Sequence, residues 1–190
     1  MTALPQDTRY TYADILALSE GKRGELVEGV YRMAPAPSTS HQSIVTELLV
    51  QIGSYLKGKR RKVFPAPFGV RLFERKGDHP HNVTTYVEPD ISVICDPDKL
   101  DERGCKGAPD LVIEVLSPAS LGHDRLTKFN LYQRAGVKEY WIVSPHEKTL
   151  QVFLLEEGRF SAVGFYGPTE RVKVAVLDDC TVDLTPVFQE

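Results

Sequence analysis

Two short apolar runs, Val87–Cys95 and Leu111–Leu116, constrain the fold of this chain more than any other part of its sequence. Both are rich in Val, Ile and Leu and are bounded by proline and charged residues, which predicts buried central strands of a sheet. Each run nevertheless contains one acidic residue, Asp90 in the first and Glu114 in the second. We therefore expect two adjacent strands that each carry a carboxylate into a largely apolar environment.

A buried carboxylate needs a partner, because removing its charge from water without compensation is costly. Two of them predict a shared divalent cation. Hard ions such as Mg²⁺ take one or two protein carboxylates, and waters and substrate phosphate complete the octahedron. The alternative is that each acid lies at a strand end and faces solvent. That alternative explains a single acid well, but it explains less well two acids in separate apolar runs, each introduced by a proline.

A basic residue follows on the next predicted helix, which covers Gly122–Ala135 and stops at a glycine. Asp124, Lys128 and Tyr132 recur every four residues and so share one helix face. If that face packs over the strand of Glu114, the lysine could orient an attacking water or stabilise charge on the reacting phosphate. On the residues alone, an ordinary Asp-to-Lys surface pair, stabilising by only about a few tenths of a kcal/mol, is favoured.

The remaining elements are predicted from apolar periodicity and turn residues. The expected helices are Thr11–Gly21 and a long one that begins after Ser38, Thr39 or Ser40 and carries an apolar stripe from Ile44 to Leu56. The expected strands are a pair over Glu25–Met33 that turns at Glu28-Gly29, then Val63–Phe73, Glu139–Val143, and a C-terminal meander of Gln151–Leu155, Phe160–Phe165 and Val172–Val176. Arg75–Thr85 is expected to be an exposed loop.

This order of elements predicts an α/β (α+β) fold in which helices flank a mixed central sheet and extra strands follow at the C-terminus. The chain has 190 residues and is 42% hydrophobic, which is enough for one sizeable core. We expect a single domain over residues 1–190, with its core at about 11–145 and the β-meander at about 149–188.

Charge and cysteine content exclude several classes of protein. A net charge of −3 argues against indiscriminate binding to the nucleic-acid backbone, so any phosphate-binding surface must be local. The basic run Lys57–Lys62 is one candidate, although cations at a helix end also oppose the macrodipole, and the two readings weigh equally. His79 and His81 lie in a polar loop with no third ligand in sight and are expected to be solvated.

The three cysteines, Cys95, Cys105 and Cys180, are odd in number and form no CxxC pair. Neither a disulfide framework nor a zinc ribbon is expected, which favours a reducing, cytoplasmic setting. No apolar run approaches the roughly 18 to 20 residues that a membrane span requires, and the first ten residues lack a signal-peptide layout. We expect a soluble protein with no membrane partner.

Several segments together resemble the Uma-type restriction endonuclease family of the PD-(D/E)XK nuclease superfamily. These segments are Glu25–Gly29, His41 at the start of the long helix, Val87–Val93, Ala108–Pro118, Asp124, Lys128, Tyr132 and Gly136–Val143. The resemblance covers nearly the whole chain from Tyr12 to Phe160. It implies a core of one helix, a mixed sheet and a second helix. The first acidic residue of the superfamily pattern then corresponds to Asp90 and the second to Glu114.

The resemblance also implies a cofactor and a set of roles. Mg²⁺ or Mn²⁺ would bind Asp90 and Glu114, together with the carbonyl oxygen of Val115. The superfamily pattern places a lysine two residues after the second acid, where this chain has Leu116, and in the Uma-type branch the basic residue maps to Lys128. This lysine would position the nucleophile.

Three accessory residues are implied near the same cleft. Glu28 and His41 could reach it as a further ligand or a phosphate contact, and Asp124 shares the helix face of Lys128. For His41, a place in the capped first turn of the long helix is an equally good account.

The expected function is metal-dependent hydrolysis of DNA phosphodiester bonds, by a homodimer if both strands of a duplex are cut. The alternative is a catalytically silent protein that keeps this fold to bind nucleic acid or to assemble as a homodimer. The sequence contains no base-reading motif, so RNA or a small phosphodiester remains open as the substrate.

Overall fold

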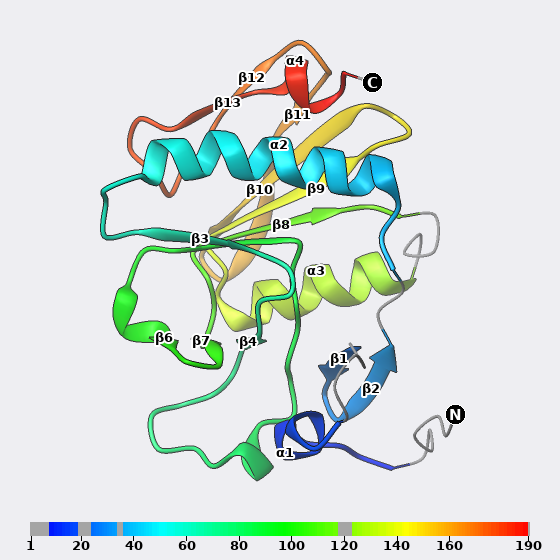
Figure 1. Ribbon diagram of the computed structural model, residues 1–190, viewed down its shortest axis with the longest axis vertical. Helices are drawn as coiled ribbons and strands as arrows, with labels where there is room; N and C mark the ends of the chain where they lie inside the picture. The colour runs from blue at the N-terminus through cyan, green and yellow to red at the C-terminus, as the bar shows by residue number, and fades with distance from the viewer. Residues whose placement is uncertain (1–7, 19–23, 34–35, 118–122, 190) are drawn as a thin grey trace.

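A six-stranded mixed sheet forms the centre of the protein in a computed structural model that describes residues 8–18, 24–33, 36–117 and 123–189 (Figure 1). Across the sheet the strands are β11 (Arg159–Tyr166), β10 (Thr149–Glu156), β9 (Glu139–Ser144), β8 (Leu111–Val115), β5 (Ile91–Ile94) and β3 (Lys62–Pro65). Strands β8 and β9 are parallel, and the other neighbours are antiparallel. The expected mixed sheet flanked by helices is confirmed.

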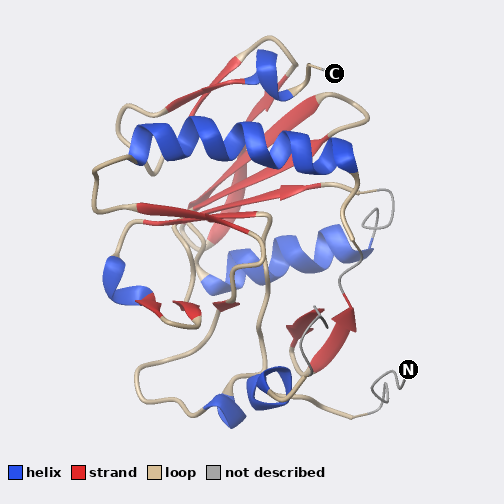
Figure 2. Cartoon of the chain, viewed as in Figure 1, coloured by secondary structure: helices blue, strands red, loops and turns tan. Residues whose placement is uncertain are grey.

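Two long helices cover opposite faces of this sheet (Figure 2). Helix α2 (Thr39–Leu56) lies on one face, and helix α3 (His123–Ala135) lies on the other. Helix α3 is also the crossover between β8 and β9, because parallel neighbours cannot be joined by a tight turn. Its position in the chain therefore carries it directly past the end of β8, where Glu114 lies.

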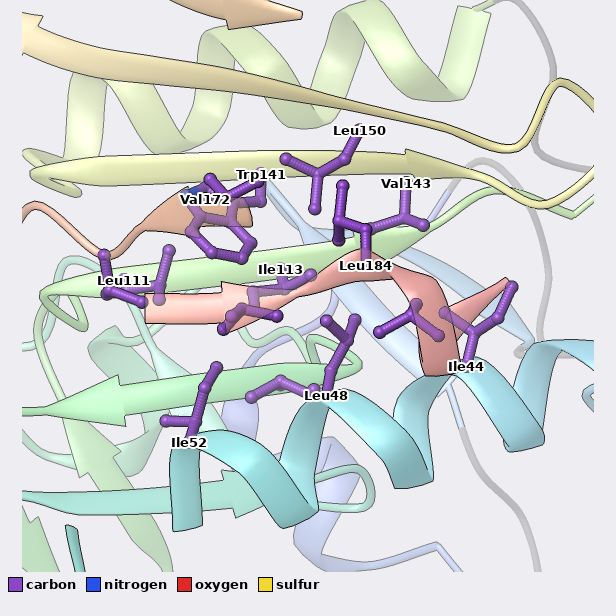
Figure 3. Close-up of a cluster of buried hydrophobic side chains, with 14 of the residues drawn as sticks. Ile44, Leu48, Ile52, Leu111, Ile113, Trp141, Val143, Leu150, Val172 and Leu184 are labelled. Carbon is purple, nitrogen blue, oxygen red and sulfur yellow. The ribbon is translucent and has the colours of Figure 1, made fainter. Parts of the chain in front are cut away.

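The apolar stripe of α2 packs into the largest of the three hydrophobic clusters (Figure 3). Ile44, Leu48 and Ile52 point at the sheet, where they meet Ile113 and its neighbours. The helix begins where Ser38 Oγ accepts a hydrogen bond from the backbone N–H of His41, so the serine caps the first turn. The stripe and the cap together fix both the rotation and the starting point of α2.

The C-terminal region differs from the expected meander. The hairpin β10–β11 extends the central sheet, but β12 (Arg171–Lys173) pairs with β13 (Thr181–Asp183) and not with β11. The expectation that Val172–Val176 continues one meander is therefore wrong. Val172 and Val174 are fully buried and join the core under α2, together with the short helix α4 (Leu184–Val187). Burial of these side chains against α2 outweighs pairing along the open edge of β11.

An N-terminal hairpin and a short helix lie beside α3 on the other side of the sheet (Figure 1). Strands β1 (Gly24–Val27) and β2 (Val30–Met33) turn at Glu28 and Gly29, and both turn residues have positive φ, of 51° and 83°. The expected strand pair and its turn are confirmed. Helix α1 (Tyr12–Leu16) is shorter than expected, and the predicted cap at Gly21 lies outside the described residues.

Two expected strands are shorter than predicted because proline interrupts them. The segment Val63–Phe73 splits into β3 and β4 (Val70–Arg71), and β5 begins only at Ile91, so Asp90 precedes the strand. Proline lacks the N–H that a ladder requires, and prolines stand at positions 65, 67 and 89.

A small three-stranded sheet lies apart from the central one. Strand β4 pairs in parallel with β7 (Gly104–Lys106), which pairs with β6 (Leu100–Asp101). The 3₁₀ turn Pro97–Lys99 leads into β6, and Pro80–Asn82 forms a second 3₁₀ turn in the expected exposed loop. Within the described residues, no helix is both long and apolar enough to span a membrane.

Candidate active site

Asp90 and Glu114 face one another across two neighbouring strands. In the β5–β8 ladder Ile91 pairs with Ile113, which places Asp90 opposite Glu114 one residue further along. Residues directly opposite in an antiparallel pair have their Cβ atoms within about 5.5 Å of each other. Their side chains are 17% and 11% exposed, so both carboxylates lie at a mostly buried end of the strand pair.

The carboxylate of Asp90 is held by two donors. Its Oδ2 accepts a hydrogen bond from the backbone N–H of Val115 at 2.8 Å and lies 3.1 Å from Nε2 of His41. His41 comes from the first turn of α2, which the Ser38 cap fixes in place. Its pKa is raised, chiefly by the hydrogen bond to Asp90, which favours an imidazolium that donates to the carboxylate.

Glu114 is held from the opposite side of the sheet by α3. Its Oε1 accepts hydrogen bonds from Lys128 Nζ at 3.0 Å and from the Tyr132 hydroxyl at 2.6 Å. Lys128 and Tyr132 are one turn apart and so present the same helix face to the acid. The Lys128 side chain is only 15% exposed and contacts Glu114 directly, so it is not the surface residue that the alternative interpretation required.

A third carboxylate, which the sequence analysis did not single out, belongs to Glu25. Its Oε1 accepts a hydrogen bond from Lys128 Nζ at 3.0 Å and one from the backbone N–H of Glu88 at 3.1 Å. The alternation of β1 could have identified it, because Leu26 is fully buried and Glu25 therefore points to the other face of the hairpin.

The residue selected in that segment, Glu28, lies in the turn of the hairpin. Its side chain is 56% exposed and pairs with Arg134 at 2.7 Å. The structure therefore brings His41, but not Glu28, into contact with the acid pair. Asp124 lies within α3, but its side chain is outside the described part of the chain.

The cluster carries more negative than positive charge. Three carboxylates, on Glu25, Asp90 and Glu114, surround one lysine and one histidine. Burial raises the pKa of Glu114 to about 7; Lys128 opposes this shift, and the charges of Asp90 and Glu25 add to it. The pKa of Lys128 is raised despite its burial, because Glu114 and Glu25 stabilise its charge. The lysine is therefore a permanent cation.

The donor set suits a hard divalent cation. In the part of the chain that the structure describes, neither Asp90 Oδ1 nor Glu114 Oε2 has a hydrogen-bond partner, while the other oxygen of each carboxylate is held in place. Among these residues no three His, Cys, Asp or Glu side chains group as ligands of one ion. Mg²⁺ needs only one or two protein carboxylates, so the opposed pair is a sufficient set.

The raised pKa of Glu114 predicts how stability depends on pH when no divalent metal is present. The unfolded chain releases this proton near the ordinary glutamate value of 4.5, whereas the folded protein holds it to about 7. Between those values the folded state binds more protons, so the free energy of unfolding should fall as pH rises from about 4.5 to about 7. Urea unfolding in EDTA at a series of pH values measures this slope.

The Glu114→Gln variant provides the comparison, since glutamine does not titrate. Its stability should decline less than that of the wild type over the same pH interval. Parallel curves for the two proteins would show that Glu114 does not hold the proton.

Other polar residues considered from the sequence lie outside this cluster. Lys57, at the start of the basic run, is 16 residues from His41 along α2, which is roughly 24 Å at about 1.5 Å per residue. Within the run, Lys59 lies over the Tyr55 ring and Arg61 pairs with Asp178. His79 and His81 stack on each other, and the three cysteines are free thiols.

Comparisons with known proteins support this fold and also identify a protein family that the chain matches. The family model described as "Uma2: Putative restriction endonuclease" matches residues 10–185. The crystal structure of a "putative nuclease belonging to DUF820" from Anabaena variabilis superimposes with a TM-score of 0.70, at 24% identity, over 94% of this chain and 97% of that one.

A curated relative matches over a shorter stretch. An uncharacterized protein of Synechocystis sp. is 41% identical over 64 residues, which are 33% of this chain. The matched region spans only 34% of that relative's length.

Proposed function

Because the chain belongs to the Uma2 family of restriction-endonuclease-like proteins, we propose that it is a metal-dependent endonuclease that hydrolyses phosphodiester bonds of DNA. One observation carries the proposal. Asp90 and Glu114 oppose each other at the end of two strands, and Lys128 lies in contact with Glu114. Two carboxylates beside a cation form the kind of arrangement that metal-assisted phosphodiester hydrolysis requires.

The ligands of the ion would be Asp90 Oδ1, Glu114 Oε2 and the carbonyl oxygen of Val115. Mg²⁺ or Mn²⁺ bound there would lower the pKa of a bound water and neutralise charge that develops on the phosphate. The Val115 N–H and His41 hold the other oxygen of Asp90, which keeps that carboxylate in one orientation. Release of the proton from Glu114 would accompany metal binding, because only the ionised carboxylate is a strong ligand.

Lys128 would orient the attacking water and stabilise negative charge on the phosphate through its ammonium group. Glu25 and Glu114 fix the position of that ammonium with two hydrogen bonds of 3.0 Å. Tyr132 donates to the same oxygen of Glu114 and so limits its rotation. We assign Lys128 the catalytic role, and Glu25 and Tyr132 positioning roles.

The assembly and the cellular setting belong to the same proposal. Cutting both strands of a duplex at one place favours two copies of this site, which a two-fold homodimer would supply. Free thiols on Cys95, Cys105 and Cys180 are consistent with work in a reducing cytoplasm. Sedimentation of the protein with and without a DNA duplex measures the number of copies.

Cleavage of nucleic acid by the wild-type protein tests the proposal. Supercoiled plasmid, single-stranded DNA and RNA are each incubated with Mg²⁺, with Mn²⁺ and with EDTA. We expect nicking of plasmid that depends on the divalent ion and stops in EDTA. Cleavage that persists in EDTA, or an absence of cleavage on every substrate, would contradict it. Faster cleavage of RNA than of DNA would identify RNA as the substrate and would leave the proposed metal site unchanged.

A further inference from the structure

A groove of about 550 Å³ lies beside the β1–β2 hairpin, next to the acidic cluster. Its polar walls carry Arg9, Arg32, Thr84 and Thr127. We propose that this groove binds a backbone phosphate of the nucleic-acid strand, one or more nucleotides away from the bond that is cut. This inference rests on the proposed function and adds to it the path of the substrate across the protein.

The register of the hairpin places the groove beside the catalytic residues. In β1 and β2, Glu25 pairs with Arg32, and Val27 pairs with Val30. Residues directly opposite each other, and those two positions further along, share one face of a hairpin. Since Glu25 points to Lys128, Arg32 projects from the same face. Glu25 of the acidic cluster and Arg32 of the groove therefore lie on the same face of the hairpin.

Helix α3 supplies the wall of the groove opposite the hairpin. Thr127, which lines the groove, directly precedes Lys128. The side chains of consecutive helical residues point in different directions, but the two residues are only about 1.5 Å apart along the helix axis, so the groove reaches α3 at the level of Lys128. Threonine hydroxyls on both walls, from Thr84 and Thr127, are of the kind that often contacts phosphate oxygens.

Arg9 is brought to the groove by backbone pairing. The N–H of Tyr10 donates to the carbonyl oxygen of Gly29 at 2.8 Å, which holds the N-terminal segment against the hairpin turn. The side chain of Arg9 packs so closely against the turn that a Cβ on Gly29 would lie 3.4 Å from it. The arginine is exposed and takes part in no ion pair with a described residue.

Two arginines line the groove in a protein whose net charge is −3. Arg9 and Arg32 contribute two cations, and the one carboxylate of the lining, Glu28, is already paired with Arg134. Arginine offers a planar fork of donors that matches phosphate oxygens. An anionic strand is therefore the ligand that this groove complements, and the arginines would offset the repulsion between that strand and the carboxylates of the neighbouring cluster.

Binding of labelled nucleic acid in EDTA tests the groove without any cleavage. Fluorescence anisotropy measures the dissociation constant of a DNA duplex, its single strand and the matching RNA as a function of salt. The variant carries Arg9→Gln with Arg32→Gln. Loss of one neutralised phosphate should lower the slope of log affinity against log salt by about 0.9 for a duplex. If the affinities converge at 1 M salt, binding is roughly eightfold weaker at 0.1 M.

Three further variants make the result specific. Arg171→Gln removes an exposed arginine from β12 and should bind like the wild type. Arg9→Lys with Arg32→Lys keeps both charges and should restore most of the slope, which a merely misfolded groove would not do. Lys57→Gln with Arg60→Gln tests the basic run at the other end of α2.

Three results would contradict phosphate binding at the groove. The double variant could bind like the wild type, or only the Lys57 and Arg60 variant could lose affinity. The third such result is a wild type that binds none of the three ligands. If the protein binds nucleic acid through the groove but shows no metal-dependent cleavage, the binding proposal stands and the proposed catalytic function is contradicted. Where cleavage occurs, the groove variant should raise KM and leave kcat unchanged, and an unchanged KM would count against the groove alone.

Discussion

Metal-dependent cleavage should fall by about a thousandfold or more when Asp90 is replaced by Asn or Glu114 by Gln. Stabilisation of transition-state charge by a bound metal is worth several kcal/mol, and about 1.4 kcal/mol corresponds to each factor of ten in rate. Both substitutions keep the size of the side chain but remove the charge that would hold the ion. Initial rates of plasmid nicking at saturating Mg²⁺ or Mn²⁺ measure the effect.

Asp178→Asn is the matched control, because that carboxylate is 82% exposed and pairs with Arg61 at the surface. It should cleave at the wild-type rate. Thermal unfolding gives an independent reading of the metal site. A ligand at a hundredfold excess over its dissociation constant stabilises the native state by about 2.7 kcal/mol. Mg²⁺ or Mn²⁺ should therefore raise the Tm of the wild type and of Asp178→Asn, but not that of Asp90→Asn or Glu114→Gln. Folded variants that cleave normally would place the active site elsewhere.

The largest loss of stability is expected from Arg71→Met in the small three-stranded sheet. Arg71 is only 1% exposed; it pairs with Glu74, donates to Asp101 at 2.8 Å and donates to the carbonyl of Arg103 at 2.9 Å. Methionine would fill much of the space but leave Glu74 without its cation, while Asp101 would keep only Lys106, at 3.3 Å. Breaking a buried ion pair from one side costs about 3 to 5 kcal/mol, and the lower figure applies because Asp101 keeps contact with solvent. Urea unfolding measures the difference.

The control for this substitution is Arg171→Met, which breaks the exposed pair between Arg171 and Asp183. Exposed pairs contribute about 0 to 1 kcal/mol, so this variant should unfold almost like the wild type. Equal losses in the two variants would mean that burial of Arg71 adds nothing to its contribution. The metal-dependent increase in Tm should survive in both, since neither residue contacts the acidic cluster.

Much of the fold follows from local pattern. The apolar stripe of α2, its serine cap and the turn at Glu28-Gly29 are consequences of residues that lie close together in the chain. The sequence-based predictions were wrong where contacts between residues far apart in the chain compete with local preference. The strand expected to pair with β11 pairs instead with β13, and its Val172, with the following Val174, is fully buried in the core under α2.

The candidate site likewise contains residues that the local sequence identifies and residues that it does not. Asp90 and Glu114 stand out in the sequence because each is a charge in an apolar run, and the ladder of β5 and β8 puts them opposite each other. Lys128 was selected only through family resemblance, since spacing along a helix does not reveal what the helix packs against. Glu25 was missed because its partner is 103 residues away.

By itself, the sequence determined which strands are buried and which two carboxylates they carry, because hydrophobic periodicity and proline positions act over a few residues. Only the tertiary structure decided which charges those carboxylates meet. It brings Lys128 from one face of the sheet, His41 from the other, and Glu25 from the hairpin. Electrostatic interactions depend on distance in space and on burial, and neither quantity can be read from separation along the chain.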